Sequence, residues 1–238
     1  LEQALCDIGF EVFDGGNAYI QTAILEENQE IIEALIADTE GVELLNIEHC
    51  EDINWNAQWE AEHECMELPL GVCITPHCAF GAGHHETTSM MIAALLEAKE
   101  QGWFDQHRDV LDMGCGTGVL GIMAIKCGAK QVVAIDIDDK SVHNTLENAQ
   151  ANDVKLDVRL GSTPPDGDYD LILANIHRNI LIEHMPKYVK NLKNGGELWL
   201  SGFYEEDITY LTRAAEQVGL KHIQTRSQNE WQWLRFTN

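Results

Sequence analysis

The second two-thirds of the chain alternates short apolar segments with longer segments of mixed character. Apolar runs bounded by turn residues predict strands at 110–113, 132–136, 156–160, 169–174 and 197–200. Apolar residues at helical spacing predict helices at 119–126, 140–151, 179–193 and 206–218. Strands and helices in this order form a parallel sheet that is covered on both faces. We therefore predict a doubly wound α/β fold.

Two further strands close this pattern, at 222–225 and 231–236, with a short turn at 227–229 between them. A connection this short joins antiparallel neighbours. The sheet is thus expected to hold seven strands, to be mostly parallel, and to end in an antiparallel hairpin.

The first 50 residues follow a different pattern. Strands are predicted at 10–13, 18–24 and 42–47, with a turn at 14–17. Asn28 can cap a helix whose apolar stripe consists of Ile31, Ile32, Leu35 and Ile36. This order predicts a small α+β domain, ferredoxin-like but truncated at its first strand. Because the chain begins within an apparently helical stretch, we expect further residues to precede Leu1.

A segment without glycine or proline, residues 53–63, contains Trp55 and Trp59 and is predicted to be a connecting helix. The predicted organisation is therefore an N-terminal domain over residues 1–52, a helical linker over 53–68, and an α/β domain over 69–238.

A glycine-rich loop follows the strand at 110–113 and precedes a helix. It contains Asp112, Gly114, Gly116 and Gly118. Glycines let a backbone turn sharply and approach a ligand, and a helix N-terminus offers free N–H groups. The next strand ends in Asp136, where a carboxylate can bind the two hydroxyls of a ribose. Together these features predict a site for a nucleoside cofactor.

Two nucleoside cofactors fit the glycine spacing. Gly116 to Gly121 matches the dinucleotide pattern G-x-G-x-x-G, which keeps NAD as an alternative. The carboxylate of Asp112, two residues before the first glycine, would repel a pyrophosphate. It would suit the amino and sulfonium cations of S-adenosylmethionine, which is the cofactor we predict.

A second loop, residues 80–88, holds two glycines, His84, His85 and Glu86 before an apolar helix that Thr87 or Thr88 can cap. The zinc motif His-Glu-x-x-His would need histidine at position 89, which is serine, so no metal is predicted. We expect this loop to form a lid over the methyl donor.

Asn175 is predicted to lie at the carboxyl end of a strand, where ligands bind in doubly wound sheets. Its amide could orient either the methyl-bearing end of the donor or an incoming amine. The residues that follow, Ile176-His177-Arg178, lack the prolines and the aromatic ring used to hold planar bases or amides. The sequence therefore favours a flexible amine as the methyl acceptor.

The composition restricts the partners. The 40 acidic and 15 basic residues give a net charge of −25, and no basic cluster exists to neutralise nucleic-acid phosphates. A basic protein is the expected partner, although acidity also serves solubility alone. No apolar run approaches the 18 residues that cross a membrane. Seven cysteines without a Cys-x-x-Cys pattern indicate reduced thiols, and we expect a cytoplasmic monomer.

Four segments together resemble the ribosomal protein L11 methyltransferase family (PrmA): FGAGHHETT at 80–88, LDMGCGTG at 111–118, AIDID at 134–138, and LANI at 173–176. The resemblance implies a Rossmann-like class I methyltransferase with an N-terminal substrate-recognition domain. It also implies that Thr88, Gly114, Asp136 and Asn175 bind the donor. The family has a longer segment before the loop at 80–88 than residues 67–79 supply.

The sequence thus predicts an enzyme that transfers methyl groups from S-adenosylmethionine to lysine or α-amino groups of a basic ribosomal protein. Asn175 is the expected catalytic residue. The expected donor-binding residues are Thr88, Asp112, Gly114, Gly116, Gly118, Asp136 and Asn175. Three alternatives remain: a methyltransferase for another protein or small amine, an NAD-dependent oxidoreductase, and a module that binds the donor without catalysis.

Overall fold

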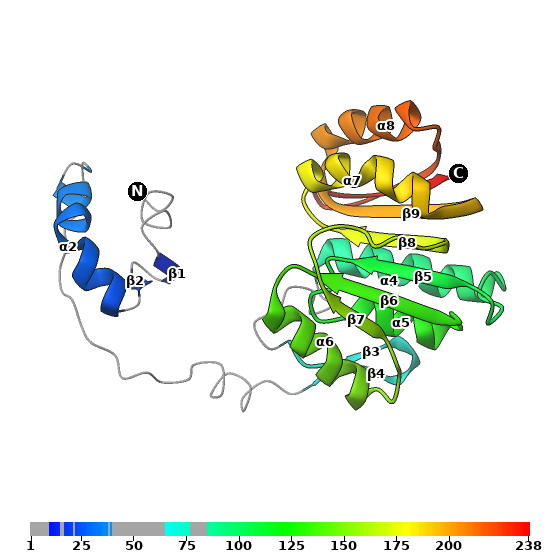
Figure 1. Cartoon of the computed structure of the whole chain (residues 1–238), viewed down its shortest axis with the longest axis horizontal. Helices are drawn as coiled ribbons and strands as arrows, with labels where there is room; N and C mark the ends of the chain where they lie inside the picture. Colours follow the sequence, from blue (N-terminus) through cyan, green and yellow to red (C-terminus); the bar gives the residue numbers. More distant parts are fainter. Residues whose placement is uncertain (1–9, 15–16, 21, 38, 40–64, 77–84) are drawn as a thin grey trace. The chain divides into compact units, whose positions relative to one another are not determined.

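The computed structural model describes residues 10–14, 17–20, 22–37, 39, 65–76 and 85–238 (Figure 1). The chain divides into two compact units, Leu1–Asn54 and Trp55–Asn238. Each unit is described by itself.

The first unit contains an antiparallel pair of strands, β1 (Phe10–Asp14) and β2 (Asn17–Ile20), and then helix α2 (Thr22–Ala37). The predicted strand at 18–24 is confirmed for residues 18–20, which belong to β2, and it is wrong beyond them because the helix begins at Thr22. The predicted cap at Asn28 is wrong for the same reason. Residues 22–27 are mostly good helix formers, and they extend the same apolar stripe by two turns. The strand expected at 42–47 and the helix expected at 53–63 lie outside the described residues.

The second unit is built on one seven-stranded sheet, with the spatial order β10-β11-β9-β8-β5-β6-β7 (Figure 1). The strands are β5 (Asp109–Met113), β6 (Gln131–Asp136), β7 (Asp157–Leu160), β8 (Tyr169–Asn175), β9 (Leu192–Tyr204), β10 (Lys221–Gln228) and β11 (Trp231–Thr237). The five strands from β5 to β9 pair in parallel, and β11 is antiparallel to both β9 and β10. The predicted sheet and its closing hairpin are confirmed.

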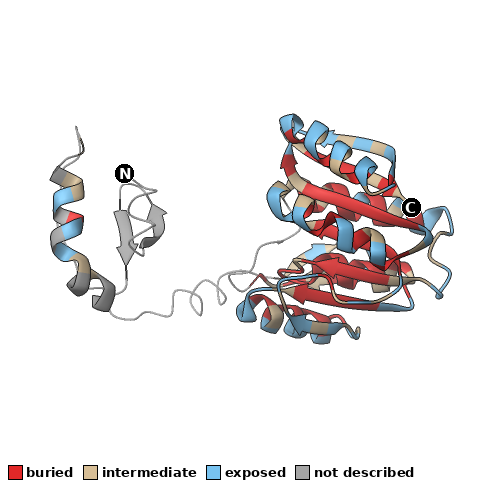
Figure 2. Ribbon diagram, turned by 45° about the horizontal axis from the view of Figure 1, so that its top comes forward, coloured by how far each residue is buried: buried red, intermediate tan, exposed pale blue. Residues whose placement is uncertain are grey.

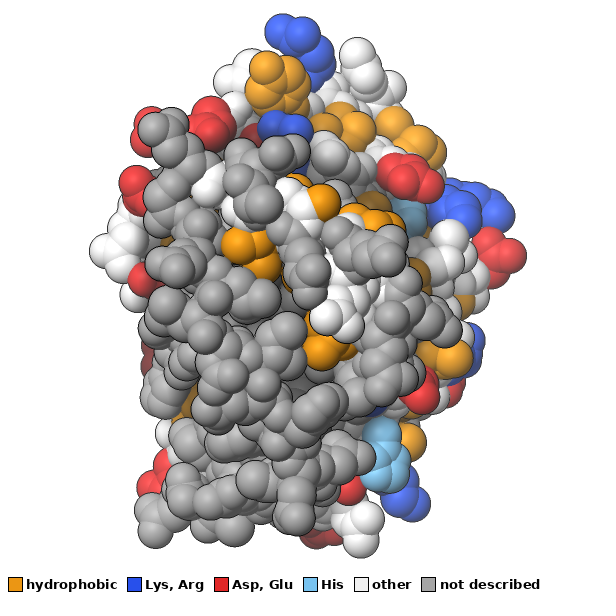
Figure 3. Space-filling model, turned by 90° about the vertical axis from the view of Figure 1, so that its left-hand side faces the viewer, with side chains coloured by type: hydrophobic (Ala, Val, Ile, Leu, Met, Phe, Trp, Pro, Cys, Tyr) orange, Lys and Arg blue, Asp and Glu red, His pale blue; other side chains and the backbone are white. Residues whose placement is uncertain are grey.

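Five helices of this unit cover the two faces of the sheet (Figure 2). They are α4 (Glu86–Glu100), α5 (Val119–Cys127), α6 (Asp139–Ala151), α7 (Arg178–Asn191) and α8 (Ile208–Gln217). Neighbouring residues of one strand enter different cores, because side chains alternate across a strand. Val110 packs with α4 and α5, whereas Leu111 packs with α7 and α8. On the face drawn in Figure 3, the charged side chains that are visible lie at the surface, whereas four carboxylates among the described residues of this unit are buried: Asp112, Asp170, Glu197 and Asp207.

Strand β9 extends beyond the predicted 197–200 at both ends, toward Tyr204 because β11 pairs with it there, and toward Leu192 because Leu192 pairs with Tyr169 of β8. The pairing with β11 joins segments some 30 residues apart, so no local pattern could reveal it. The helix predicted from residue 206 opens instead with a 3₁₀ turn, η2 (Glu205–Asp207), before α8.

A small hairpin that the sequence did not reveal precedes α4. It consists of β3 (Met66–Leu68), the 3₁₀ turn η1 (Pro69–Gly71) and β4 (Val72–Ile74). The three-residue strands are too short to show an alternating pattern. The hairpin brings the Cα atoms of Cys65 and Cys73 to 5.6 Å, a separation that a disulfide can span. The sequence did not predict this contact.

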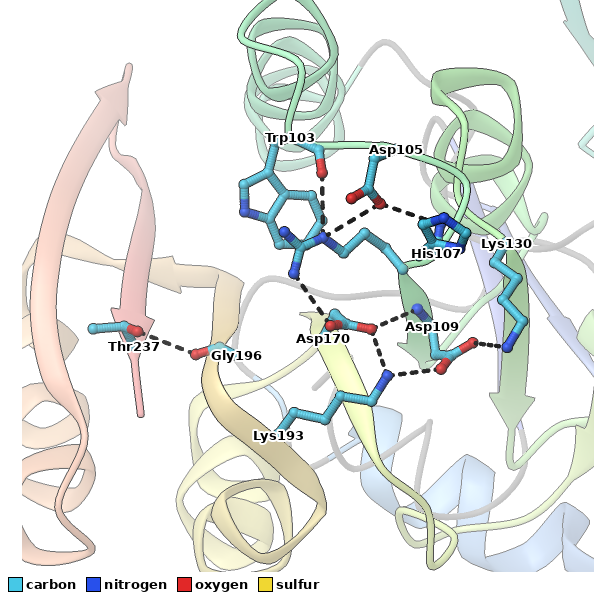
Figure 4. Close-up of polar contacts among 10 residues, drawn as sticks. Trp103, Asp105, His107, Asp109, Lys130, Asp170, Lys193, Gly196 and Thr237 are labelled. Atoms are coloured by element: carbon cyan, nitrogen blue, oxygen red, sulfur yellow. Dashed lines mark hydrogen bonds and ion pairs between the residues drawn. The ribbon is translucent and has the colours of Figure 1, made fainter.

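An ion-pair cluster joins the amino ends of β5 and β8, at the opposite edge of the sheet from Asn175 (Figure 4). The ammonium of Lys193 lies 2.7 Å from Asp170 and 2.8 Å from Asp109, and Arg108 and Lys130 complete the cluster. Burial alone would raise the pKa of Asp170. The hydrogen bonds that Asp170 accepts outweigh burial and lower its pKa. We assign this cluster a structural role.

Candidate functional site

The predicted site residues meet at the carboxyl ends of β5, β6 and β8. Strand β5 lies between β6 and β8, and the chain leaves β5 through α5 to reach β6. From β5 the chain passes to β6 and β7 on one side, and it then crosses to β8 on the other side of β5. In open α/β sheets, ligands bind beside the strand at which the order reverses in this way.

The glycine-rich loop depends on backbone angles that side chains disfavour. Gly114, Gly116 and Gly118 have φ angles of +75°, +55° and +79°. A Cβ at Gly114 would overlap Cγ2 of Ile176, and a Cβ at Gly118 would lie 2.7 Å from Cγ2 of Thr145. Packing against neighbouring side chains therefore requires glycine at positions 114 and 118, and the positive φ favours glycine at 116, independently of any ligand.

Asp112 is almost fully buried at the end of β5. Its Oδ2 accepts a hydrogen bond of 2.8 Å from the N–H of Gly121, in the first turn of α5. Its Oδ1 is buried and has no hydrogen-bond partner among the described residues. Burial raises the pKa of this carboxyl to about 7, although the bond from Gly121 opposes the shift. The side chain thus caps an orphan N–H of α5 and leaves one oxygen unpaired.

This raised pKa predicts that stability falls as the pH rises from about 4 to about 7. In that interval the unfolded carboxyl loses its proton while the folded Asp112 keeps it, so deprotonation favours unfolding. The loss is at most roughly 4 kcal/mol for a shift of about three pH units. Urea unfolding should be measured for the parent and for Asp112→Asn across pH 4.5–7.5, and the difference between their free energies of unfolding should change with pH. A difference that stays constant over this range would contradict the raised pKa of Asp112.

Asp136 ends β6 and turns its carboxylate toward the glycine loop. Its Oδ2 accepts from the N–H of Gly116 at 2.8 Å, and its Oδ1 accepts from the N–H of Asp138 at 3.1 Å. Two large apolar side chains lie exposed beside it, Ile137 at 75% and Leu160 at 62%. Leu160 is the register partner of Asp136 on β7. Sequence reasoning missed this apolar pair, since only the parallel pairing of β6 and β7 brings it together.

Thr88 and Asn175 meet across 87 positions of sequence. Nδ2 of Asn175 donates to Oγ1 of Thr88 at 3.3 Å, and Oδ1 of Asn175 is buried without a hydrogen-bond partner in the described part of the chain. The expected threonine cap of α4 is wrong, because the helix begins at Glu86 and Nδ1 of His85 accepts from the N–H of Thr87 at 3.3 Å. The lid expected at 80–88 lies outside the described residues as far as position 84.

Three rings gather beside the start of α4. The ring of Trp231 stacks on Tyr204 with 4.3 Å between centroids, and it meets the ring of His85 edge-on at 4.8 Å. Tyr204 and Trp231 are register partners on β9 and β11. Tyr204 remains 42% exposed. No local sequence signal predicted this aromatic group, whose members come from three separate elements.

Within the described residues, no cluster of three or more histidine, cysteine, aspartate or glutamate side chains is arranged to hold a metal ion. Among the helices that the structure describes, none is long and apolar enough to cross a membrane.

Comparisons with known proteins agree with these motifs. The family model described as "Ribosomal protein L11 methyltransferase (PrmA)" matches residues 16–238. A relative of that name from Porphyromonas gingivalis is 43% identical over 265 residues, which cover 100% of this chain and 89% of the relative. One from Bacteroides thetaiotaomicron is 38% identical and covers 100% and 92%. The crystal structure of a ribosomal protein L11 methylase from Lactobacillus delbrueckii subsp. bulgaricus superposes with a TM-score of 0.60 at 29% identity, covering 65% of this chain and 79% of that one.

Proposed function

Because this chain belongs to the ribosomal protein L11 methyltransferase family, we propose that it methylates lysine or α-amino groups of ribosomal protein L11. The chain is a methyltransferase of the Rossmann-like class I fold, and S-adenosylmethionine is its cofactor. The observation that carries the amine assignment is the unpaired Oδ1 of Asn175, a buried acceptor at the carboxyl edge of the sheet.

The residues at this edge fit the donor chemically. The glycine loop brings its backbone close without Cβ atoms, and the Asp136 carboxylate is an acceptor for ribose hydroxyls. The exposed Ile137 and Leu160 beside it would pack on a purine ring. The carboxyl of Asp112, whose Oδ1 is unpaired, would balance the positive charge of the donor once it has lost its proton. The donor supplies a methyl group on a sulfonium, which is activated for displacement.

The chain's own contribution to the chemistry is positioning. The amine must arrive neutral, because its lone pair forms the new nitrogen–carbon bond while the carbon–sulfur bond breaks. The Oδ1 of Asn175 would accept one N–H of the amine and so aim the lone pair, and Thr88 holds the other end of the amide. The nitrogen then releases a proton to water or to His177. Alignment of this kind lowers the barrier without a strong base.

The aromatic group supports an amine as the acceptor. Ring faces attract ammonium and methylated ammonium groups, and the exposed Tyr204 with Trp231 offers such faces beside the helix that carries Thr88. We propose that these rings hold the methylated ammonium product after the transfer.

We also propose that the acidic chain attracts a basic substrate protein, which residues 1–52 present to the catalytic domain. The net charge of −25 favours such an encounter. Incubation with labelled S-adenosylmethionine and purified ribosomal protein L11 should label L11 on amines, and raised salt should slow the reaction through screening. Label confined to another protein or to a small amine would overturn the substrate assignment. Tight NADH binding would overturn the donor assignment.

Asp136→Ala should weaken S-adenosylmethionine binding about 10- to 100-fold, since charge-assisted hydrogen bonds contribute about 1.5–3 kcal/mol each. The same substitution removes the acceptors of the Gly116 and Asp138 N–H groups, which adds to the effect. Calorimetry measures the affinity, and circular dichroism confirms folding. Asp139→Ala, at the exposed start of α6, is the matched control. Equal affinities in the two variants would remove Asp136 from the donor site.

A further inference from the structure

Three asparagines follow one another at four-residue intervals along α6 and its C-cap: Asn144 and Asn148 in the helix, and Asn152 at the cap. All three are buried. Asn152 accepts from the N–H of Cys73 at 2.8 Å and donates to its carbonyl at 2.6 Å. Asn148 makes the same pair of bonds with Thr75, at 2.9 and 3.1 Å, and Asn144 donates to the Thr75 carbonyl at 2.9 Å. The helix therefore binds β4 and the residue after it with side-chain amides, much as a neighbouring strand would.

Asn148 and Asn152 differ in the acceptor of the second hydrogen bond that the side-chain amide donates. The Nδ2 of Asn148 also donates to the carbonyl of Thr117, in the glycine loop, at 2.9 Å. The Nδ2 of Asn152 donates instead to the carbonyl of Asn148, within its own helix, at 2.7 Å. The side-chain amide of Asn148 thus connects the glycine loop directly to Thr75, the residue that follows β4.

A second side chain of α6 holds the adjacent carbonyl of the loop. The hydroxyl of Thr145 donates to the carbonyl of Gly116 at 2.8 Å, and Thr145 is fully buried. Gly116 and Gly118 flank Thr117, and glycines give a loop many alternative conformations. Bonds to two consecutive carbonyls restrict those conformations before a ligand arrives, and such preorganisation increases affinity.

We propose that Asn148 is a positioning residue for the methyl donor. It holds the Thr117 peptide in the orientation that binds the donor, and it couples that orientation to Thr75 at the end of β4. This inference rests on the proposed assignment of the glycine loop as part of the donor site. It gives α6 a role in donor binding through residues that lie outside the predicted site.

The test compares Asn148→Ala with Asn152→Ala. Each variant removes a buried amide that holds the β4 segment, so both should lower the melting temperature. Only Asn148→Ala leaves the Thr117 carbonyl without this donor. We expect its dissociation constant for S-adenosylmethionine, measured by calorimetry, to rise about 10-fold or more, against less than about 3-fold for Asn152→Ala. In steady-state kinetics, KM for the donor should rise more than kcat falls.

Thr145 provides a second pair of variants if Asn148→Ala does not fold. Thr145→Val keeps the shape but removes the bond to Gly116, whereas Thr145→Ser keeps the hydroxyl. The valine variant should bind the donor more weakly than the serine variant. The proposal would be overturned if Asn148→Ala and Asn152→Ala bound the donor with equal affinity and Thr145→Val and Thr145→Ser did so as well. If only one pair folds, equal affinities in that pair would overturn it.

Hydrogen exchange tests the coupling itself. Donor binding should slow exchange of the Thr75 N–H in the parent protein, because that N–H bonds the same amide that holds Thr117. The slowing should be absent in a folded Asn148→Ala. Unchanged Thr75 exchange in the parent, with the donor bound, would refute the coupling but keep the donor site. A parent protein that fails to bind S-adenosylmethionine at all would overturn the proposed function as well.

Discussion

Replacing Gly118 by alanine should lower the affinity for S-adenosylmethionine by about 100-fold or more and destabilise the fold by about 2–5 kcal/mol. The residue has a φ of +79°, and its new Cβ would lie 2.7 Å from Cγ2 of Thr145. A left-handed backbone costs a non-glycine residue roughly 1–2 kcal/mol, and overpacking typically adds 1–3 kcal/mol. The loop must move to relieve the overlap, and moving it displaces the N–H groups at the start of α5.

Gly219→Ala separates the cost of the backbone angle from that of the overlap. Gly219 has a φ of +93°, but a Cβ there would meet no atom within 4 Å. It lies after α8, far along the chain from the glycine loop. We expect this control to lose about 1 kcal/mol of stability and to bind the donor normally. Calorimetry measures the donor affinity of both variants, and urea unfolding measures their stability. Equal donor affinities of Gly118→Ala and Gly219→Ala would contradict the role of Gly118 in donor binding.

Asn175→Ala should reduce kcat by about 100- to 1,000-fold, in the range seen when one preorganised polar group is removed from an active site. Its unpaired Oδ1 is the proposed acceptor for the amine, and its Nδ2 bond to Thr88 holds the amide in place. The donor dissociation constant should change less than about 10-fold, because the glycine loop and Asp136 remain. Single-turnover kinetics with ribosomal protein L11 would measure the chemical step.

Asn229→Ala is the matched control for this second prediction. Its amide also lies near the start of α4, where it donates to Oε1 of Glu86 at 2.7 Å, but it is exposed. We expect kcat within about 3-fold of the parent value. If Asn175→Ala lost donor affinity and turnover in equal measure, its role would be binding alone. Normal turnover in Asn175→Ala would remove it from the chemistry.

Local patterns in the sequence predicted the sheet, because most strands, turns and helices of the seven-stranded unit are each encoded in a short segment. The apolar run before Asp112, the alternate glycines and the helix formers after Gly118 stand within about 15 residues. A strand, a glycine-rich turn and a helix in this order are typical of a βα unit in a doubly wound sheet. The parallel order follows from the repeated alternation of strand and helix, and the antiparallel closing hairpin follows from the short turn at 227–229. Both are present in the structure.

The errors occurred where a short segment supports two structures or where distant pairing decides. Residues 18–24 are apolar enough for a strand, yet Thr22 begins a helix that continues to Ala37. The extent of β9 depends on β11, and the contact between Cys65 and Cys73 depends on a hairpin of three-residue strands. None of these features produces a hydrophobic periodicity from which the sequence alone could predict it.

The sequence by itself determined the family, the α/β class and the donor, because the glycine spacing and the acid that ends the next strand are local and chemically specific. Only the tertiary structure brought Thr88 to Asn175, stacked Trp231 on Tyr204, and joined the glycine loop to β4 through Asn148. These contacts connect residues from 27 to 87 positions apart. Their geometry comes from how helices and strands pack and pair, which hydrophobic periodicity does not specify.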